Sequence, residues 1–272
     1  MPAFSHHQWA SLTTAQIEHI DMGEAICVLP VAAVEQHGPH LPLGTDTMIM
    51  EGYLARLLPR LPAGEPVLFL PVQSVGASRE HENFPGTLSL APDVAMRIWG
   101  DMLAQVAATG CRKLLLLNSH GGNVPVLDLV AREARAAHDV LAVTASWHRF
   151  GYPEGLFSDA ERLHGIHGGD IETSLMLAFR PELVNMALAD DFVPASVDMA
   201  ASFTWLRANH PVGFGWMAED LSARGAMGNA ALATRAKGEL AAEHAVKACL
   251  DLLQDIKKFD LARLRAGPFT FA

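Results

Sequence analysis

The residues best suited to chemistry stand in one short stretch, VEQHGPHLPLGTDT at 34–47, which carries Glu35, His37, His40 and Asp46. The stretch follows an apolar run and is interrupted by glycine and proline, which indicates a loop leaving a buried strand. Glu35 and His37 are two residues apart, so an extended segment can point both side chains to one side. Asp46 opens a run with helical periodicity, where a helix N-terminus favours a carboxylate. Its two oxygens could bridge two metal ions.

Histidine and carboxylate side chains also follow the later apolar runs. They stand beside small polar residues and glycines in SVGASREHENFPGT (Ser78, Glu80, His81), NSHGGN (Asn118, His120, Gly121, Gly122, Asn123), the pair Trp147 and His148, and HGIHGGDIETS (His164, His167, Asp170, Glu172). Imidazole and carboxylate groups without cysteine form a ligand set that suits Zn(II), Mn(II) or Fe(II). The pattern therefore predicts a metal site.

Each of these residues also has an ordinary explanation. Asp46 or Glu172 could cap a helix, Trp147 could be a core aromatic, and a loop histidine is usually solvated. We favour the metal site because the ordinary explanations require separate coincidences at several strand ends.

The elements that must position these residues alternate along the chain. Apolar runs predict strands at 24–31, 67–72, 113–118 and 140–147, and helical periodicity predicts helices at 46–58, 91–109, 124–138, 169–178 and 229–257. Continuous apolar strands alternating with helices predict an α/β fold, a mainly parallel central sheet in a three-layer α/β/α arrangement. Ligands bind such sheets beyond the carboxyl ends of the strands. We expect a single domain over 1–272, with a long irregular excursion at 186–227 that serves as a lid or an interface.

Composition excludes several classes of protein. The 272 residues carry a net charge of -10 and no basic block, which argues against a nucleic-acid partner. No apolar stretch is long enough to span a membrane, and no secretory signal opens the chain, so we expect a cytoplasmic protein. Cys27, Cys111 and Cys249 stand far apart in apolar contexts, which predicts buried thiols. The chain contains no GxSxG, GxxxxGK[ST] or HExxH motif.

Ordered motifs over residues 25–238 resemble the creatininase (creatinine amidohydrolase) family. They are VEQHGxHLPLGTD, SxEHxxFPGT, NxHGGN, HxGxxETS and, from Gly225 to Gly238, GxxGNxxxATxxKG. The resemblance implies a three-layer α/β/α domain, a homohexamer, and a metal centre that hydrolyses C–N amide bonds. It implies metal ligands at Glu35, His37, Asp46, His120 and Glu172, with Asp46 as the bridge, and a catalytic histidine at His167.

One departure from the family bears on the substrate. Creatininases proper carry a ligating glutamate two residues after the third-strand histidine, whereas this chain has Gly122 in the HGGN form of other members. The last ligand then falls to Glu172, which we also expect to take part in catalysis, and creatinine is less favoured as the substrate.

We therefore expect a metal-dependent amidohydrolase that cleaves a C–N bond of a small amide, cyclic or open, or of a formamide. Two divalent ions are expected, zinc first, with manganese or iron(II) as alternatives. The same site could instead serve C–C hydrolysis of a cyclic ketone or peptide cleavage, or the protein could be a non-catalytic metal-binding scaffold. The residues expected around the ligands or substrate are His40, Ser78, Glu80, His81, Asn118, Gly121, Gly122, Asn123 and Trp147.

The excursion and its flanks offer further candidates without a motif. Residues 203–205 and 214–216 each contain a phenylalanine and a tryptophan, and these stretches could close over a substrate or form a subunit interface. Arg149, Arg162 and Arg207 could hold an anionic group, although a surface position is the more common one for arginine. GAMGNA at 225–230 predicts the start of a helix that lines the site.

Overall fold

A computed structural model describes residues 7–265 of the chain. Its central sheet contains four parallel strands in the order β2-β1-β3-β4. They are β1 (Ile26–Val31), β2 (Val67–Phe69), β3 (Lys113–Asn118) and β4 (Leu141–Ser146). The predicted parallel sheet is confirmed.

The central strand β1 and the interior of the central strand β3 are apolar because they are covered on both faces. In β1, Ile26 and Val28 belong to one core cluster, whereas Cys27 and Leu29 belong to the other. Side chains alternate between the faces of a strand, so an unbroken apolar run supplies two cores at once. All three cysteines are free and buried, as predicted.

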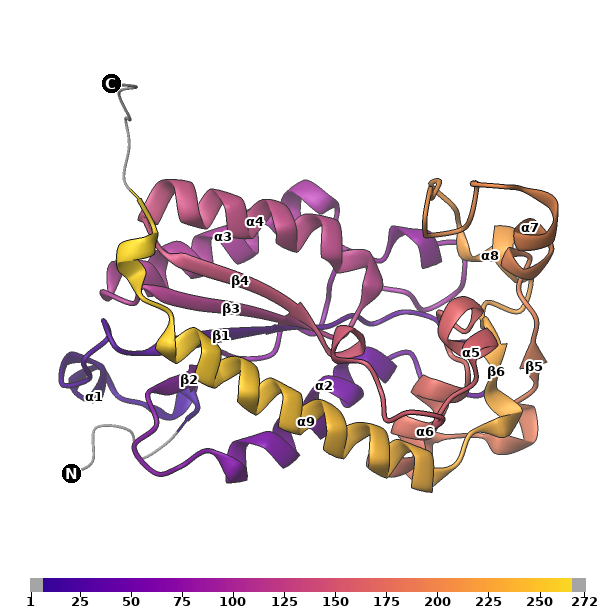
Figure 1. Cartoon of the computed structure of the whole chain (residues 1–272), viewed down its shortest axis with the longest axis horizontal. Coiled ribbons are helices and arrows are strands. Elements are labelled where there is room, and N and C mark those ends of the chain that lie inside the picture. Colours follow the sequence, from indigo (N-terminus) through magenta and orange to yellow (C-terminus); the bar gives the residue numbers. More distant parts are fainter. Residues whose placement is uncertain (1–6, 266–272) are drawn as a thin grey trace.

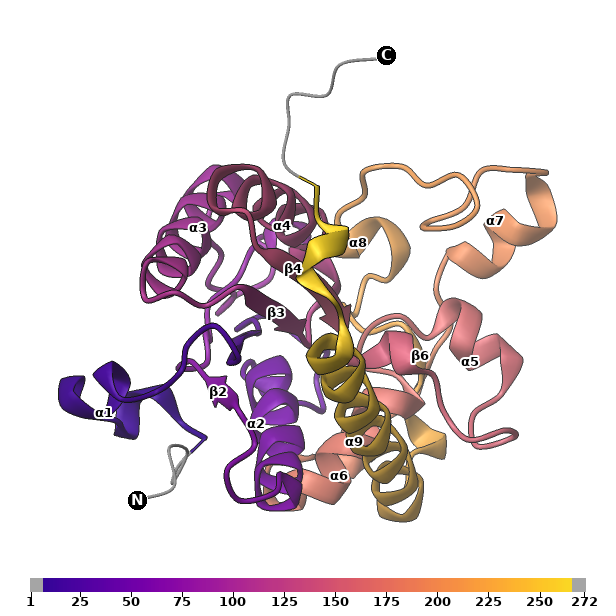
Figure 2. The same cartoon turned by 60° about the vertical axis from the view of Figure 1, so that its left-hand side comes forward.

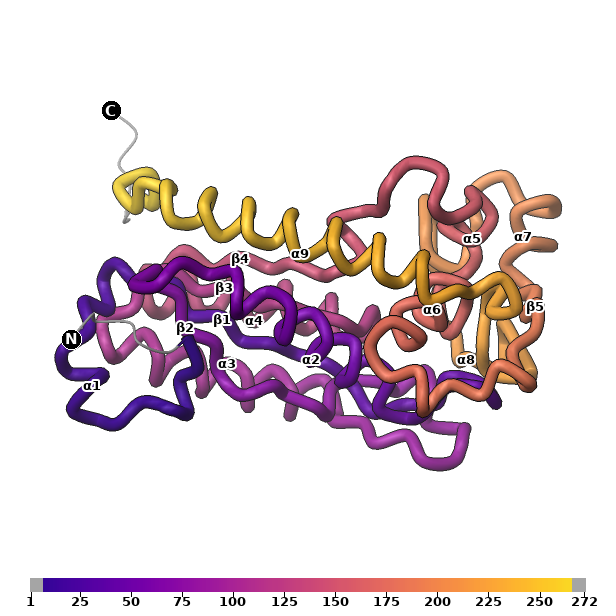
Figure 3. Tube along the Cα trace, turned by 90° about the horizontal axis from the view of Figure 1, so that it is seen from below, coloured from indigo at the N-terminus to yellow at the C-terminus, as the bar shows by residue number. Residues whose placement is uncertain are grey.

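Helices complete the three layers, which Figure 2 shows on either side of the sheet. One face carries α3 (Pro92–Ala108) and α4 (Val124–His138). The other carries α2 (Thr45–Leu57), α6 (Asp170–Phe179) and the long α9 (Arg235–Lys258). Figure 3 shows α9 running alongside the strands with its first turns next to α6. The predicted α/β/α fold is thus confirmed.

The carboxyl ends of three strands coincide. Val31 of β1 pairs with Asn118 of β3, which pairs with Ser146 of β4. Smaller elements gather beyond this end, on the right of Figure 1. They are α5 (Asp159–His164), β5 (Asp191–Phe192), α7 (Ser196–Ser202), α8 (Ala218–Leu221) and β6 (Gly228–Asn229), whereas α1 (Thr14–Glu18) precedes the sheet.

The predicted helix at 229–257 begins six residues late, and the prediction that GAMGNA starts it is wrong. Residues 228–229 form β6, which pairs antiparallel with β5, and Met227 exchanges backbone hydrogen bonds with His167. Gly228 has φ 126°, a conformation outside a right-handed helix. Helix α9 starts at Arg235 because the Thr234 side chain accepts a hydrogen bond from the Lys237 N–H.

Two expectations concern the chain as a whole. Within residues 7–265, no helix is both long and apolar enough to cross a membrane. The single domain over 1–272 stays a prediction, since residues 1–6 and 266–272 lie outside the described part.

Candidate metal centre

The loop after β1 is closed on itself, which presents its polar side chains in a fixed direction. The Glu35 N–H donates to the Leu43 carbonyl at 2.8 Å, so the intervening residues form a compact turn. Gly38 lies within this turn at φ 68°, and a Cβ there would lie 2.7 Å from the Ala226 Cβ. Glycine thus permits both the turn and its contact with the 225–229 segment.

The five residues expected as ligands lie together at the end of the sheet. His37 Nε2 is 3.9 Å from Glu35 Oε1, 3.8 Å from Asp46 Oδ1 and 3.7 Å from Glu172 Oε2. His120 Nδ1 is 3.1 Å from Glu35 Oε1 and 3.5 Å from Asp46 Oδ2. The loop after β1, the start of α2, the end of β3 and the start of α6 each contribute to this cluster.

The donor atoms divide into sets that could each hold one ion. Glu35, Asp46 and His120 form one triplet, and His37, Asp46 and Glu172 form another. Asp46 belongs to both, with Oδ1 facing His37 and Oδ2 facing His120. A third grouping joins Glu35 and His37 to His167. A shared carboxylate with one oxygen on each side is the arrangement of a bridging ligand in a two-metal site.

Backbone carbonyls orient both imidazoles. His37 Nδ1 lies 3.0 Å from the Glu35 carbonyl, and His120 Nε2 lies 3.1 Å from the Ala77 carbonyl. A carbonyl only accepts, so each of these nitrogens carries the proton and donates. The opposite nitrogens, His37 Nε2 and His120 Nδ1, then face the carboxylates, in the orientation from which each could ligate a metal after losing its proton.

Several donor atoms in the cluster are buried without a hydrogen-bond partner among residues 7–265. They include both carboxylate oxygens of Glu35, His37 Nε2 and Asp46 Oδ2. Buried charged oxygens without partners are costly to a fold. Their convergence is what divalent ions would satisfy, so the residues present fit a metal centre.

The electrostatics of the cluster are strongly coupled. Although burial disfavours a charged imidazole, Asp46, Glu172 and Glu35 raise the pKa of His37 to about 9. Glu35, Asp46 and Glu80 likewise raise the pKa of His120 to about 10 against the effect of burial. Burial and the neighbouring Glu35 raise the pKa of Asp46. Mutual perturbation of this kind is typical of a functional site.

His167 and His81 lie beside the cluster as neutral imidazoles. Burial and the nearby His37 hold the pKa of His167 well below its usual range and lower that of His81 to about 3. His167 Nε2 lies 2.6 Å from the Gln36 carbonyl and donates to it, which leaves Nδ1 free at 3.6 Å from Glu35 Oε1. His81 Nε2 is 3.5 Å from the same oxygen. Both rings line the cavity above the cluster.

Most of the residues expected around the ligands lie in contact with them. Ser78 Oγ and Glu80 Oε1 approach His120 Nε2 at 3.2 Å and 3.5 Å. Asn118 binds the backbone of His120 at both its N–H and its carbonyl, and Asn123 donates to Asn118 Oδ1 at 3.1 Å. Gly121 and Gly122 line the cavity. These contacts fix the His120 ring.

Two residues and one segment named as candidates around the ligands or the substrate line neither cavity. Trp147, which follows β4, is buried in the hydrophobic core, and its ring stacks on that of Tyr53 with 4.1 Å between the ring centroids. It therefore lines neither of the cavities described below. His40 points away to Thr173 Oγ1 at 2.9 Å. Residues 203–205 line neither cavity either, whereas Phe214 and Trp216 line the one above the cluster.

Two residues of the site were not predicted. The Gln36 side chain donates to His81 Nδ1 at 2.8 Å and to the Gly225 carbonyl at 3.1 Å, which ties together three segments around the cluster. Buried Glu161 accepts from the N–H groups of Ile171 and Asn229 at 3.3 Å and 3.0 Å. Its neighbours Gly165, Gly169 and Gly228 leave the room it occupies. The glycines around 165–169 were the only sequence signal for this carboxylate.

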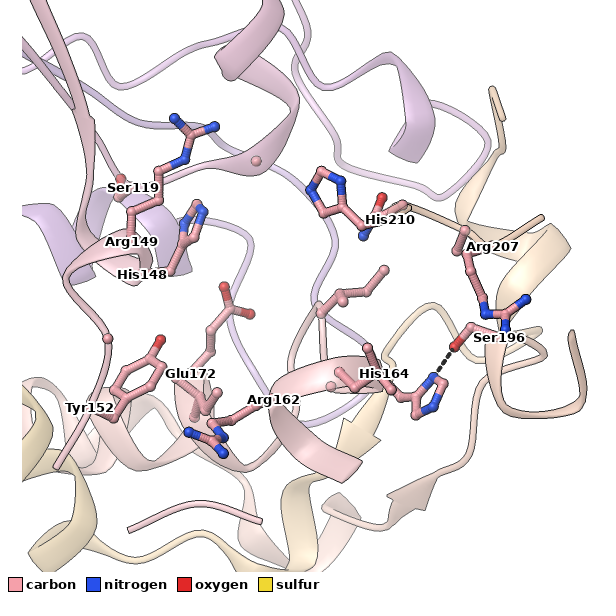
Figure 4. A pocket seen from close by; sticks show the side chains of 18 residues that line it. Ser119, His148, Arg149, Tyr152, Arg162, His164, Glu172, Ser196, Arg207 and His210 are labelled. Carbon is pink, nitrogen blue, oxygen red and sulfur yellow. Dashed lines mark hydrogen bonds between the residues drawn. The ribbon is translucent and has the colours of Figure 1, made fainter. Parts of the chain in front are cut away.

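Two cavities open on this end of the sheet. One, of about 590 Å³, lies directly above Glu35, Asp46, His120 and Glu172. The other, of about 620 Å³, adjoins it and is shown in Figure 4. Cavities of this size accommodate drug-sized ligands.

Comparisons with known proteins agree with this geometry. A family model described as creatinine amidohydrolase matches residues 10–253. A creatinine amidohydrolase of Pseudomonas putida is 32% identical over 86% of this chain and 90% of its own length. A mycofactocin precursor peptide peptidase of Mycolicibacterium smegmatis is 31% identical over 84% of this chain and 83% of its own.

Solved structures agree as well. A creatininase described as the manganese form superposes with a TM-score of 0.70 at 28% identity, covering 93% of this chain and 99% of that one. A mutant creatininase described as a zinc–zinc type gives a TM-score of 0.69 at 28% identity, covering 92% and 98%. A parallel α/β/α fold with a histidine–carboxylate cluster at its strand ends defines the class, and this chain belongs to the creatininase family of hydrolases.

Proposed function

We propose that this creatininase-family hydrolase cleaves the C–N bond of a small amide or formamide with two divalent metal ions. The observation that carries the proposal is the pair of donor triplets that share Asp46. Among their atoms, both Glu35 carboxylate oxygens, His37 Nε2 and Asp46 Oδ2 are buried without a hydrogen-bond partner within residues 7–265. Glu35, Asp46 and His120 would hold one ion, and His37, Asp46 and Glu172 the other. Divalent ions in such a site polarise a carbonyl and make water a nucleophile at neutral pH.

The chain itself would supply orientation and proton transfer. His167 is neutral, lines the cavity and has a free Nδ1, so it is suited to accept a proton from water and return it to the leaving nitrogen. Glu172 is the most exposed carboxylate of the two triplets, with 23% of its side chain accessible, and burial raises its pKa to about 7. A carboxyl that titrates near neutrality can support the same transfer.

Zinc is the proposed occupant, with manganese as the alternative, since relatives occur in both forms. A peptide is a second candidate substrate, because the relatives include peptidases and the adjoining cavities offer more room than a single small ring requires.

The test is metal content per chain together with hydrolysis of creatinine, formamides, small cyclic amides and short peptides. We expect about two equivalents of metal, as for a two-metal hydrolase. Glu172→Gln should lose about one equivalent and Asp46→Asn both, with activity lost in each. Asp101→Asn, on the exposed face of α3, is the matched control. A chain that takes up no zinc or manganese, or a Glu172→Gln variant with unchanged content, would contradict the proposal.

We also propose that the protein assembles as a homohexamer, as the family resemblance implies. Exposed apolar side chains between 193 and 214 support an assembled state, since surfaces of this kind usually face a partner.

A further inference from the structure

The cavity of Figure 4 adjoins the one above the metal cluster and shares part of its lining. His148, Arg149, Glu172 and His210 belong to both cavities. A ligand whose reacting group lies at the cluster can therefore extend into the second cavity. The residues that line the second cavity therefore indicate the chemistry of the part of the substrate that does not react.

The second cavity has an excess of positive charge. Arg149, Arg162 and Arg207 line it, whereas Glu172 is its only carboxylate. Glu172 in turn faces His37 and accepts from the Gly168 N–H at 2.6 Å, so it belongs to the cluster. In Figure 4 the Arg149 guanidinium lies at the top and the Arg162 guanidinium at the bottom, with Glu172 between them, and His164, Ser196 and Arg207 lie on the right.

The three arginines differ in the hydrogen-bond and ion-pair partners of their guanidinium groups. Arg207 donates to the carbonyls of Phe203 and Leu206 at 2.6 Å and 2.8 Å, so it holds its own loop together. Arg162 pairs with Asp159 on the same helix. Arg149 makes no side-chain hydrogen bond or ion pair within residues 7–265, yet it lines both cavities. It is the one guanidinium of the three with its donors free.

We propose that Arg149 binds a carboxylate on the substrate, so that the enzyme acts on amides whose far end is anionic, such as N-acyl amino acids and short peptides with a free carboxyl terminus. This inference rests on the amidohydrolase function proposed above. A guanidinium offers paired donors that match a carboxylate, and such charge-assisted pairs are the stronger hydrogen bonds. Arg162 and Arg207 add positive charge elsewhere around the same cavity.

The reaction on such a substrate is ordinary hydrolysis. The amide C–N bond breaks, a C–O bond forms with water, and both protons of the water end on the leaving nitrogen, giving a carboxylate and an ammonium group. The substrate carboxylate held by Arg149 is unchanged, so Arg149 acts by positioning the amide over the cluster.

The test compares matched substrates in the metal-loaded enzyme. N-formylleucine is paired with N-formylisoamylamine, which lacks only the carboxylate, and a dipeptide with its C-terminal amide. We expect the wild type to prefer the anionic member of each pair. Arg149→Gln should raise KM for the anionic member by about 10- to 100-fold with kcat little changed, the loss of one charge-assisted pair. For Arg149→Lys, KM for the anionic member should lie between the values for the wild type and for Arg149→Gln.

Arg97→Gln is the matched control, because Arg97 is an exposed arginine on α3 that lines neither cavity. A second readout is independent of turnover: succinate binding to the metal-loaded protein by calorimetry, expected to weaken in Arg149→Gln and not in Arg97→Gln. Equal use of both members of each pair, with succinate binding unchanged by Arg149→Gln, would overturn the inference and leave the proposed function standing. Lack of hydrolysis of any amide, with succinate binding still dependent on Arg149, would overturn the proposed function and keep the anion site.

Discussion

The two carboxylate oxygens of Asp46 face two different imidazoles, so Asp46 belongs to both potential metal sites of the cluster. Its oxygens face His37 and His120 from opposite sides at 3.8 Å and 3.5 Å. Each imidazole donates to a backbone carbonyl through one nitrogen, so that its other nitrogen points into the cluster. The positions of these three side chains therefore link metal binding to the protonation of the two imidazoles.

We predict that metal binding releases protons near neutral pH. Without metal, the carboxylates raise the pKa of His37 to about 9 and of His120 to about 10, so both donor nitrogens are protonated at pH 7. Since a ligating nitrogen must be deprotonated, binding of zinc should release about two protons per chain, and affinity should rise as the pH increases from 6.5. Calorimetry in buffers of different ionisation enthalpy measures the release. Proton-independent binding would contradict the assignment of these histidines.

The same shifts predict how the metal-free fold responds to pH. A raised pKa in the folded state stabilises the fold fully below the ordinary value of 6.5. That stabilisation is lost as the pH rises through about 9 for His37 and about 10 for His120. The raised pKa values of Asp46 and Glu172 act in the same direction. Chemical denaturation of the chelated protein should therefore show a falling free energy of unfolding from pH 6.5 to pH 10, and saturating metal should reduce the decline.

Gly122 and Gly121 provide a matched pair of substitutions. A Cβ on Gly122 would overlap Glu80 Oε1 and lie 2.5 Å from His120 Nε2 and 2.6 Å from the Ala77 carbonyl, whereas a Cβ on Gly121 meets nothing within 4 Å. We predict that Gly122→Ala displaces His120 and weakens metal binding at its triplet by about 10- to 100-fold. Gly121→Ala should leave metal titrations unchanged. Equal affinities in both variants would show that the His120 ring can move without cost.

At the scale of elements, α6 must be held so that its first turn meets the loop after β1. Glu161 on α5 links the start of α6 to β6 through the Ile171 and Asn229 N–H groups. Asp170 adds a pair with Lys237 of α9 at 2.5 Å. These contacts set where Glu172 lies relative to His37.

We predict that Glu161→Gln loosens this junction. The amide replaces one acceptor by a donor that faces a backbone N–H, so the free energy of unfolding should fall by about 1–3 kcal/mol. Metal should be lost from the Glu172 triplet before the Glu35 and His120 triplet, as a titration with paired metal analysis would detect. Glu154→Gln, at an exposed carboxylate, is the control. Equal loss from both triplets would argue for general unfolding rather than a positioning role.

At the scale of the whole molecule, apolar side chains remain exposed beyond the sheet. Val193, Phe203, Trp205 and Val212 are 65%, 49%, 68% and 52% exposed, all between β5 and α8. An exposed apolar surface of this kind usually marks an interaction site.

We predict that this surface is buried in the proposed hexamer. Trp205→Glu should shift the sedimentation of the protein from a large assembly towards smaller species, because it places a charge in an apolar contact. Leu129→Glu, on α4 and 54% exposed, is the control that should leave the assembly intact. A wild-type protein that sediments as a monomer, or dissociation by the control alone, would contradict the assignment.

The sequence by itself determined the layers, the strand and helix boundaries to within a few residues, and the identity of the polar cluster. It did so because these patterns are local: a short apolar run such as the four leucines of KLLLLN, too short for a helix and following a glycine turn, indicates a strand buried on both faces. Short elements at 159–164, 196–202 and 218–221 escaped prediction because one or two helical turns carry too little periodicity. The start of α9 was misjudged because Gly228 has a backbone conformation that composition does not reveal.

Only the tertiary structure decided which polar residues meet. His40 and His37 are three residues apart in the same loop, yet one binds Thr173 and the other faces the cluster, since the turn directs them oppositely. Trp147 lies in the core. Gln36, which the first motif contains without a predicted role, and Glu161, which lies in none of the motifs, hold the segments around the cluster together. Side-chain partners from strands and helices more than a hundred residues apart depend on packing in space, and local sequence patterns do not contain that information.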